Sequence, residues 1–339
     1  MKKNFKKISL ILAALVLICQ ISFASTKINT NRISGEDRYE TNLLINTLYL
    51  KLLSRPGKTF DSFVMVSGEN YPDALAAAVY ATKKQSALLL TPKDKVLDST
   101  SKFIKDNAFT DGIFVGGSET LSKDLYLKVN SFVPNLRRIF GKDRNDTSAL
   151  LSTESKLKFI TNGSFFADAL AVGPLVIYED GDLLLTGQTT SLDGIAVGGE
   201  NSLKGSFKDR ISGEDRYKTS IEIAKRMPPS NTFILCSGEN YPDALSSGIL
   251  AGIKSIPILL TEPNKLNKDV KDFIYEKGYI NCIIVGGKNS ISKAVEDEIK
   301  NMNIENPSII GDLNPINPNP INPNPIVTPG EPFPPKSDR

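Results

Sequence analysis

The sequence of 339 residues contains no histidine. Without histidine, neither Ser-His-Asp nor Cys-His activation of a nucleophile is available, and the commonest ligand of zinc is missing. Acidic residues are numerous, but no pair is singled out by its spacing as the two carboxylates of a glycoside hydrolase. The sequence therefore argues against an enzyme, and we expect neither a metal site nor a cofactor.

Cysteine is scarce as well. Beyond the first 24 residues only Cys236 and Cys282 occur, and both stand inside apolar runs, "FILCSG" and "NCIIVGG". Two cysteines make no disulfide framework. We expect small residues in the cores of two strands, with a disulfide between them as the alternative.

Acidic residues are missing from the first 24 positions, where "MKKNFKK" leads into the apolar run "ISLILAALVLICQISF". Small residues at Ser22 and Ala24 complete the pattern of a Sec-type signal peptide cleaved before Ser25. An uncleaved anchor is an alternative, although the run is short for a bilayer span of roughly 20 residues. Lipidation of Cys19 is a second alternative. It is disfavoured because Ile18 stands where a lipobox has a small residue.

The charge changes when this segment is removed. The whole chain carries +3, and the first 24 residues contain four lysines and no acid, which leaves −1 for the remainder. A general attraction to polyanions is therefore not expected, and anion binding must depend on local clusters. We expect no nucleic-acid partner and no membrane association after cleavage.

Internal repeats dominate the rest of the chain. "RISGEDRY" occurs at 32–39 and again at 210–217. "VSGENYPDALAAAVYA" at 66–81 matches "CSGENYPDALSSGILA" at 236–251, and "IFVGG" and "IIVGG" keep the same offset of 170 residues. A module of about a hundred residues is thus duplicated.

A third, shorter copy lies between these two. It opens with "RIFGKDRN" at 138–145 and continues with "ITNGSFFADALAVGP" at 160–174. Because "TGQTTSLDG" is too short for a full crossover helix, we expect one helix here to be lost or reduced to a turn. The predicted boundaries are 1–24 for the signal peptide, 32–137, 138–209 and 210–312 for modules 1, 2 and 3, and 313–339 for a Pro-rich tail.

Each full module alternates short apolar runs with helical patterns. "FVMVSG", "SALLLT", "GIFVGG" and "LRRIFG" are typical of buried parallel strands. The helix expected over 37–53 has Leu44 and Leu48 on its apolar face, together with Tyr39, Leu43 and Leu52. The pattern predicts the α/β class, with parallel sheets covered by helices and Rossmann-like wrapping. The proline-rich sequence after residue 312 predicts an extended, exposed tail.

The repeated motifs allow two interpretations. Asp73 in "SGENYPDAL" follows a strand and begins a helix, where it can complement the helix dipole or contact a ligand. The arginines of "RISGEDRY" can form an ion-pair clamp between modules or an anion site, and the two roles can coexist. Three copies favour multivalent binding over catalysis.

Together, "RISGEDRYETN", "VSGENYPDALAAA", "ALLLTP" and "IFVGGSETLS" resemble the cell wall binding repeat 2 family of clostridial cell wall and surface-layer proteins. The resemblance covers residues 32–312. It implies three Rossmann-like modules in a pseudo-threefold arrangement, which anchor a protein noncovalently to an anionic wall polymer of the teichoic-acid type. It carries over no catalytic motif.

The resemblance and the repeats together define a set of candidate polymer-binding residues: Arg32, Asp37, Arg38, Asn70, Asp73, Arg138, Asp143, Arg144, Asp168, Arg210, Asp215, Arg216, Asn240 and Asp243. The middle repeat departs at several matching positions, so its site is expected to work least like the others. There Asn145 stands for Tyr39, Ser164 for Glu69, Phe166 for Tyr71 and Ala167 for Pro72.

The expected protein is thus secreted and located at the cell wall or surface of a Gram-positive bacterium. Its partner would be an anionic wall polymer, with other surface-layer proteins as further partners. The alternatives are a wall hydrolase or amidase, and a structural protein of a surface lattice or an adhesin.

Overall fold

A computed structural model describes residues 25–54, 60–305 and 307. Three four-stranded parallel sheets form its framework, one for each module. The predicted α/β class is therefore confirmed. The predicted signal peptide and the predicted Pro-rich tail lie outside the described residues.

Sheet 1 has the strand order β4-β3-β5-β6, and helices connect its parallel strands. Continuous apolar runs form the two central strands because helices cover both faces. Its elements are β3 (Ser62–Ser67), α3 (Tyr71–Lys83), β4 (Ala87–Thr91), α4 (Asp98–Asp106), β5 (Asp111–Val115), α5 (Lys123–Asn130) and β6 (Asn135–Ile139).

Sheet 2 has the equivalent order β8-β7-β9-β10 but carries fewer helices. The sequence predicts one lost helix, whereas the described segments 187–194 and 198–208 both lack one. A small apolar cluster around Ile160 and Leu203 covers that face instead, with Phe207 packed against it. The elements are α6 (Arg144–Leu150), β7 (Lys158–Asn162), α7 (Phe166–Tyr178), β8 (Asp182–Thr186), β9 (Ile195–Val197) and β10 (Asp209–Ile211).

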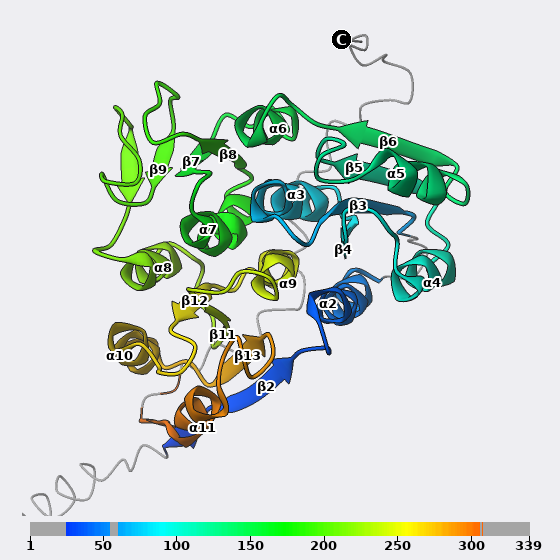
Figure 1. Cartoon of the computed structure of the whole chain (residues 1–339). Helices are drawn as coiled ribbons and strands as arrows, with labels where there is room; N and C mark the ends of the chain where they lie inside the picture. The colour runs from blue at the N-terminus through cyan, green and yellow to red at the C-terminus, as the bar shows by residue number, and fades with distance from the viewer. Residues whose placement is uncertain (1–24, 55–59, 306, 308–339) are drawn as a thin grey trace, which may run out of the picture.

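Sheet 3 has the order β12-β11-β13-β2, so its fourth strand comes from the N-terminal end of the described chain. In Figure 1, β2 lies beside β13 and α11. The short strand β1 also pairs with β14 in antiparallel fashion. The elements are β1 (Thr26–Lys27), β2 (Asn29–Ile33), α8 (Arg216–Ala224), β11 (Thr232–Ser237), the 3₁₀ turn η1 (Ala244–Ser246), α9 (Ser247–Lys254), β12 (Ile258–Thr261), α10 (Lys268–Lys277), β13 (Asn281–Val285), α11 (Lys293–Asn301) and β14 (Asn303–Ile304).

The helices α3, α7 and α9 pack against one another at the centre, and the three sheets surround them (Figure 1). Small residues let these helices approach closely: a Cβ on Gly252 would lie 2.3 Å from Cδ1 of Ile177. Each contact between modules repeats around this centre, with α6 beside α3, α8 beside α7, and α2 (Arg38–Leu53) beside α9. The pseudo-threefold arrangement is therefore present.

The helix that opens each module covers the outer edge of its sheet. In α2 the inward side chains include Asn42 and Asn46, which accept hydrogen bonds from the backbone amides of Leu90 and Leu88 on β4, at 3.0 and 2.9 Å. The predicted apolar face of this helix is wrong for Leu44 and Leu48, which are 42% and 40% exposed. Its other members, Tyr39, Leu43 and Leu52, are partly buried and pack against the core. Satisfying the free backbone groups of an edge strand requires polar side chains there. In modules 2 and 3, Ser148 and Ser220 make the matching contact.

Both remaining cysteines are free and buried, as predicted for small core residues. Burial raises the pKa of the Cys236 thiol to about 12, although a hydrogen bond to Ser247 opposes the rise. The alternative of a disulfide between Cys236 and Cys282 is therefore excluded for this structure. These thiols are packing groups rather than nucleophiles.

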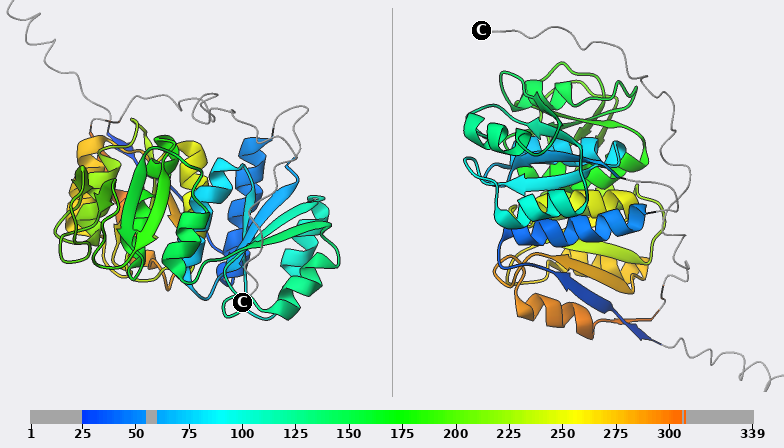
Figure 2. Two further views of the ribbon diagram at one scale, coloured as in Figure 1. Left: turned by 90° about the horizontal axis from the view of Figure 1, so that it is seen from above. Right: turned by 90° about the vertical axis from the view of Figure 1, so that its right-hand side faces the viewer.

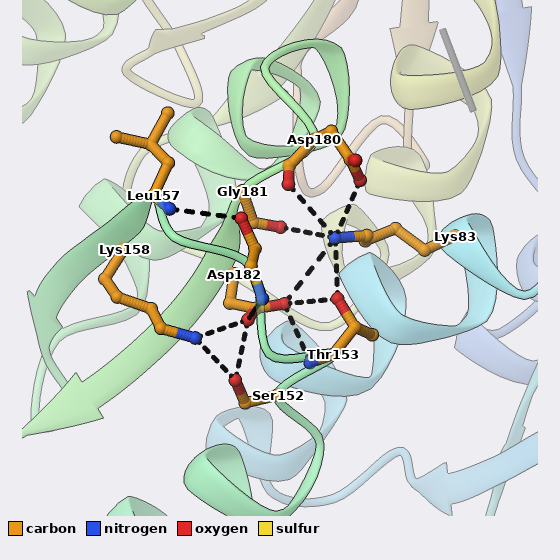
Figure 3. Close-up of polar contacts among 9 residues, drawn as sticks. Lys83, Ser152, Thr153, Leu157, Lys158, Asp180, Gly181 and Asp182 are labelled. Carbon is orange, nitrogen blue, oxygen red and sulfur yellow. Dashed lines mark hydrogen bonds and ion pairs between the residues drawn. The ribbon is translucent and has the colours of Figure 1, made fainter. Parts of the chain in front are cut away.

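A polar cluster joins modules 1 and 2 (Figure 3). The buried Asp182 accepts hydrogen bonds from Lys158 and Ser152, both at 2.6 Å, and from the amide and hydroxyl of Thr153. Lys83 reaches in from α3 and donates to the hydroxyl of Thr153 at 2.7 Å. The helix α6 has 7 residues, whereas the equivalent helix α2 has 16. The cluster orders the segment that follows this shorter helix.

Candidate binding face at the module junctions

Each copy of the opening motif forms a junction, in which a fourth strand leads into the first helix of a module. The first arginine of the motif folds back over its own sheet. Arg32 donates from Nη1 to the carbonyl oxygens of Gly286 and Gly287, at 2.6 and 3.2 Å, and from Nε and Nη2 to Glu296. Its guanidinium is therefore occupied by contacts within the protein.

The copies of this arginine behave alike. Arg138 donates to the carbonyls of Gly116 and Leu121 at 3.0 and 2.8 Å, and Arg210 to those of Gly198 and Leu203 at 2.6 and 3.0 Å. The loop that they hold is the V-G-G turn after the third strand. Its first glycine has φ of +117°, +115° and +113° in the three modules, a backbone region that other residues rarely adopt.

The glycine and aspartate of the motif build the start of the opening helix. A Cβ on Gly141 would lie 2.2 Å from Cβ of Asp146, so only glycine allows this approach. Asp37 accepts hydrogen bonds from the amides of Tyr39 and Glu40 at 2.9 and 2.8 Å, which makes it an N-cap. The equivalent caps are Asp143 and Asp215.

The second arginine of the motif serves the next module. Nη1 of Arg38 donates to the carbonyl of Gly68 at 2.6 Å, and Nη1 of Arg144 to that of Gly163 at 2.8 Å. Arg216 makes the same contact with Gly238. Arg144 and Arg216 are exposed, and within the described residues their Nε and Nη2 groups make no hydrogen bond. These donors remain available to a ligand.

An aspartate of the preceding module faces this second arginine. Burial raises the pKa of Asp73, and the charge of Arg144 opposes the rise. Burial raises the pKa of Asp168 to about 6, against the opposing charge of Arg216. A carboxyl group and a guanidinium therefore influence each other electrostatically across each of these two junctions, but the described residues form no ion pair there.

The third aspartate, Asp243, differs from the other two. Its Oδ2 accepts hydrogen bonds from the hydroxyl of Ser290 at 2.6 Å and from the amide of Gly287 at 3.2 Å. It therefore fixes the V-G-G turn of its own module. The remaining candidates, Asn70 and Asn240, are exposed in the loops after β3 and β11.

An aromatic cluster on the pseudo-threefold axis is not predicted from the sequence. The rings of Tyr71, Phe166 and Tyr241 meet with centroids 5.1 to 6.0 Å apart. Each tyrosine hydroxyl donates to the next module: Tyr71 to the carbonyl of Ser164 at 2.6 Å, and Tyr241 to that of Glu69 at 3.0 Å. The available signal was the aromatic residue two positions before each repeated aspartate.

The described part of the chain contains no group of acidic, cysteine or histidine side chains suited to hold a metal ion. Nor does it contain a helix long and apolar enough to cross a membrane. What the three junctions share is a guanidinium group and an aromatic ring, on a protein built from three repeated α/β modules.

The chain belongs to the family described as cell wall binding domain 2 (CWB2), whose model matches residues 32–126, 138–208 and 210–296. Two relatives come from Bacillus subtilis (strain 168). The chain is 27% identical over 324 residues to N-acetylmuramoyl-L-alanine amidase LytC, covering 89% of this chain and 64% of the relative. It is 26% identical over 293 residues to the amidase enhancer, covering 80% and 40%.

Two solved structures from Clostridium difficile share the fold. Cwp6 superposes with a TM-score of 0.71 at 22% identity, over 81% of this chain and 48% of Cwp6. Cwp8 gives a TM-score of 0.70 at 20% identity, over 80% and 51%. The chain thus spans about half to two thirds of most of these proteins. Family membership supports cell wall binding and a location at the cell wall or surface.

Proposed function

We propose that this chain is an exported protein that attaches noncovalently to an anionic secondary polymer of the cell wall, of the teichoic-acid type. The observation that carries the proposal is the second arginine of each junction. Each gives one nitrogen to a backbone carbonyl and keeps the others as donors. Charge-assisted hydrogen bonds from such a fork suit phosphate and carboxylate groups.

Two junctions are proposed as the stronger binding sites: the one between modules 3 and 1, at Arg38, and the one between modules 2 and 3, at Arg216. Each has an exposed asparagine in the following loop, Asn70 or Asn240, whereas the middle module has Phe165 at that position. Tyr39 and Tyr217 also lie against Gly68 and Gly238, where Asn145 replaces them in the middle module. The middle junction is proposed to serve mainly as a clamp.

The test is a pull-down with purified walls and with defined wall polymers. Arg38→Ala and Arg216→Ala should each weaken binding about tenfold to a hundredfold, the effect of losing one or two charge-assisted hydrogen bonds. Lys102→Ala is the matched control: it removes one positive charge from α4, where the side chain is 75% exposed. Binding should also weaken with salt.

Two outcomes would contradict the proposal. One is equal binding to walls from which the anionic polymer has been stripped. The other is an unchanged affinity in the double arginine variant with unchanged thermal stability. Loss of stability without loss of affinity per folded molecule would show that the arginines are clamps alone.

We further propose that the chain binds the wall without cleaving it. The amidase relative is longer than the match, so its activity need not reside in the shared part. Zymography on purified walls tests this: a cleared band from the purified chain would refute it. Attachment to a surface lattice is compatible with wall binding and would appear as co-purification with surface-layer proteins.

A further inference from the structure

The fourth strand of sheet 3 is not supplied by the end of module 3. In sheets 1 and 2, β6 and β10 follow in chain order from the third strand of the same sheet. In sheet 3 that position is filled by β2, which lies beside β13 (Figure 2). Asn29 of β2 lies against Asn281 of β13, 252 residues away. The ring of three modules is therefore closed by a noncovalent seam.

The seam has specific contacts. β2 runs parallel to β13, with Ile33 opposite Val285. Ile28 and Ile304 are both buried, and β1 pairs with β14 beside them. Arg32 adds an ion pair with Glu296 at 2.9 Å. In module 1 the residue that matches Glu296 is Tyr126, and its ring centroid lies 5.2 Å from the guanidinium of Arg138.

The sequence contains a second segment that matches this strand position. Counted with the offset of 170, Ile309 and Gly311 correspond to Ile139 and Gly141 of the opening motif, but Ser308 stands where Arg138 would be. A serine cannot reach the two carbonyls and the carboxylate that Arg32 contacts. Among the described residues, β2 fills the fourth-strand position, and its Arg32 makes all three contacts.

We propose that residues 26–33 form an exchangeable closing strand, and that module 3 can take the same strand from a second copy of the chain. Only residues 34–37 connect this strand to α2, so it can leave sheet 3 while every other module stays intact. Exchange of an identical element between copies is an accessible route to dimers. The high effective concentration of the tethered strand favours closure within one chain, and high protein concentration favours exchange.

The experiment uses cysteine pairs placed on different molecules, in full chains whose Cys19, Cys236 and Cys282 are replaced by alanine. Asn29→Cys chains are mixed with Asn281→Cys chains under mild denaturant, returned to buffer and oxidised. The matched control is a mixture of Asp111→Cys and Asn135→Cys chains. That pair touches at 3.4 Å as the first pair does, but belongs to a sheet that is continuous in the chain.

Exchange predicts a crosslinked heterodimer from the first mixture and none from the second, with a yield that rises with concentration. Arg32→Ala should speed the exchange severalfold without changing the final yield, because the same contacts form in the closed chain and in the dimer, and Arg138→Ala should change neither. The proposal is overturned if the first mixture gives no heterodimer, or if both mixtures give equal amounts.

Hydrogen exchange on the unmodified chain provides a test that does not depend on folding of the variants. Amides of residues 29–33 should exchange through a separate, faster opening than those of 135–139. Equal protection of the two strands would also overturn the proposal.

Discussion

Replacing Asp182 by asparagine should lower the free energy of unfolding by about 3–5 kcal/mol, the usual cost of breaking a buried ion pair from one side. The residue is 3% exposed and sits between Lys83 and Lys158. Burial by itself raises the pKa of this carboxyl. Hydrogen bonds from Lys158, Ser152 and Thr153 outweigh burial and hold the pKa well below its usual range. An amide group would place a donor against these donors and leave Lys83 without its buried partner.

The neighbouring Asp180 provides the control. It pairs with the same Lys83 nitrogen at 2.9 Å, but its side chain is 57% exposed. Asp180→Asn should therefore cost less than about 1 kcal/mol, as for a surface pair. Both variants remove a negative charge from the same lysine, but only Asp182 is buried and also accepts hydrogen bonds from Lys158, Ser152 and Thr153.

Urea denaturation followed by far-UV circular dichroism measures both costs, since the chain has no tryptophan for fluorescence. The Asp182→Asn midpoint should fall by about 10 °C in thermal scans, at roughly 2–4 °C per kcal/mol. Because the folded pKa is lowered, the contribution of Asp182 is present above about pH 4 and is lost as the pH falls further. Equal costs for the two variants, or a deficit that persists unchanged at pH 2, would refute the reasoning.

Three further outcomes follow from the junctions and the axis. Phe166→Tyr should raise the melting temperature by a few degrees, because its hydroxyl can donate to the carbonyl of Glu239 and complete the ring of tyrosine contacts; an unchanged value would count against that ring. Asp168→Asn should be more stable than the wild type by about 2–3 kcal/mol above pH 6 and equal to it below pH 4. The reason is that the pKa of Asp168 is raised to about 6, so ionising this carboxyl lowers the stability of the folded state. Melting curves recorded across this pH range check the prediction. Gly141→Ala should cost more than about 2 kcal/mol in urea titrations, because its Cβ would overlap that of Asp146, and a neutral effect would contradict the close approach.

The strand runs were predictable because a parallel strand covered on both faces is apolar at every position. "FVMVSG", "SALLLT" and "GIFVGG" each became a buried strand for this reason. The face of α2 was not predictable from apolar spacing. Asn42 and Asn46 point inward because β4 has backbone groups to satisfy, and that requirement exists only once the sheet has formed. Polar residues at helical spacing, opposite an apolar run, are the signal to look for.

The ring closure was hidden for a different reason. Sequence repeats begin at "RISGEDRY", so Arg32 is counted with module 1, whereas its strand lies in sheet 3. Pairing between segments more than 250 residues apart leaves no local pattern. The axial aromatic cluster is similar, since Tyr71, Phe166 and Tyr241 come from three modules and meet only after the ring closes.

The two arginines of the motif explain why it occurs three times, and also where a ligand should be sought. The first arginine belongs to the preceding sheet and the second to the following module, so any closed ring of three modules needs three copies, with or without a polymer. Recurrence of the motif is therefore weak evidence for binding.

Exposed residues that ring closure does not require are better evidence for binding, and they differ between the junctions. At the matching loop position, modules 1 and 3 have the amide side chains of Asn70 and Asn240, whereas the middle module has the apolar Phe165. If closure alone constrained these loops, exchanging Asn240 and Phe165 between modules would leave wall binding unchanged. If the asparagines contact polymer, Asn240→Phe should weaken binding at constant melting temperature, and Phe165→Asn should strengthen it.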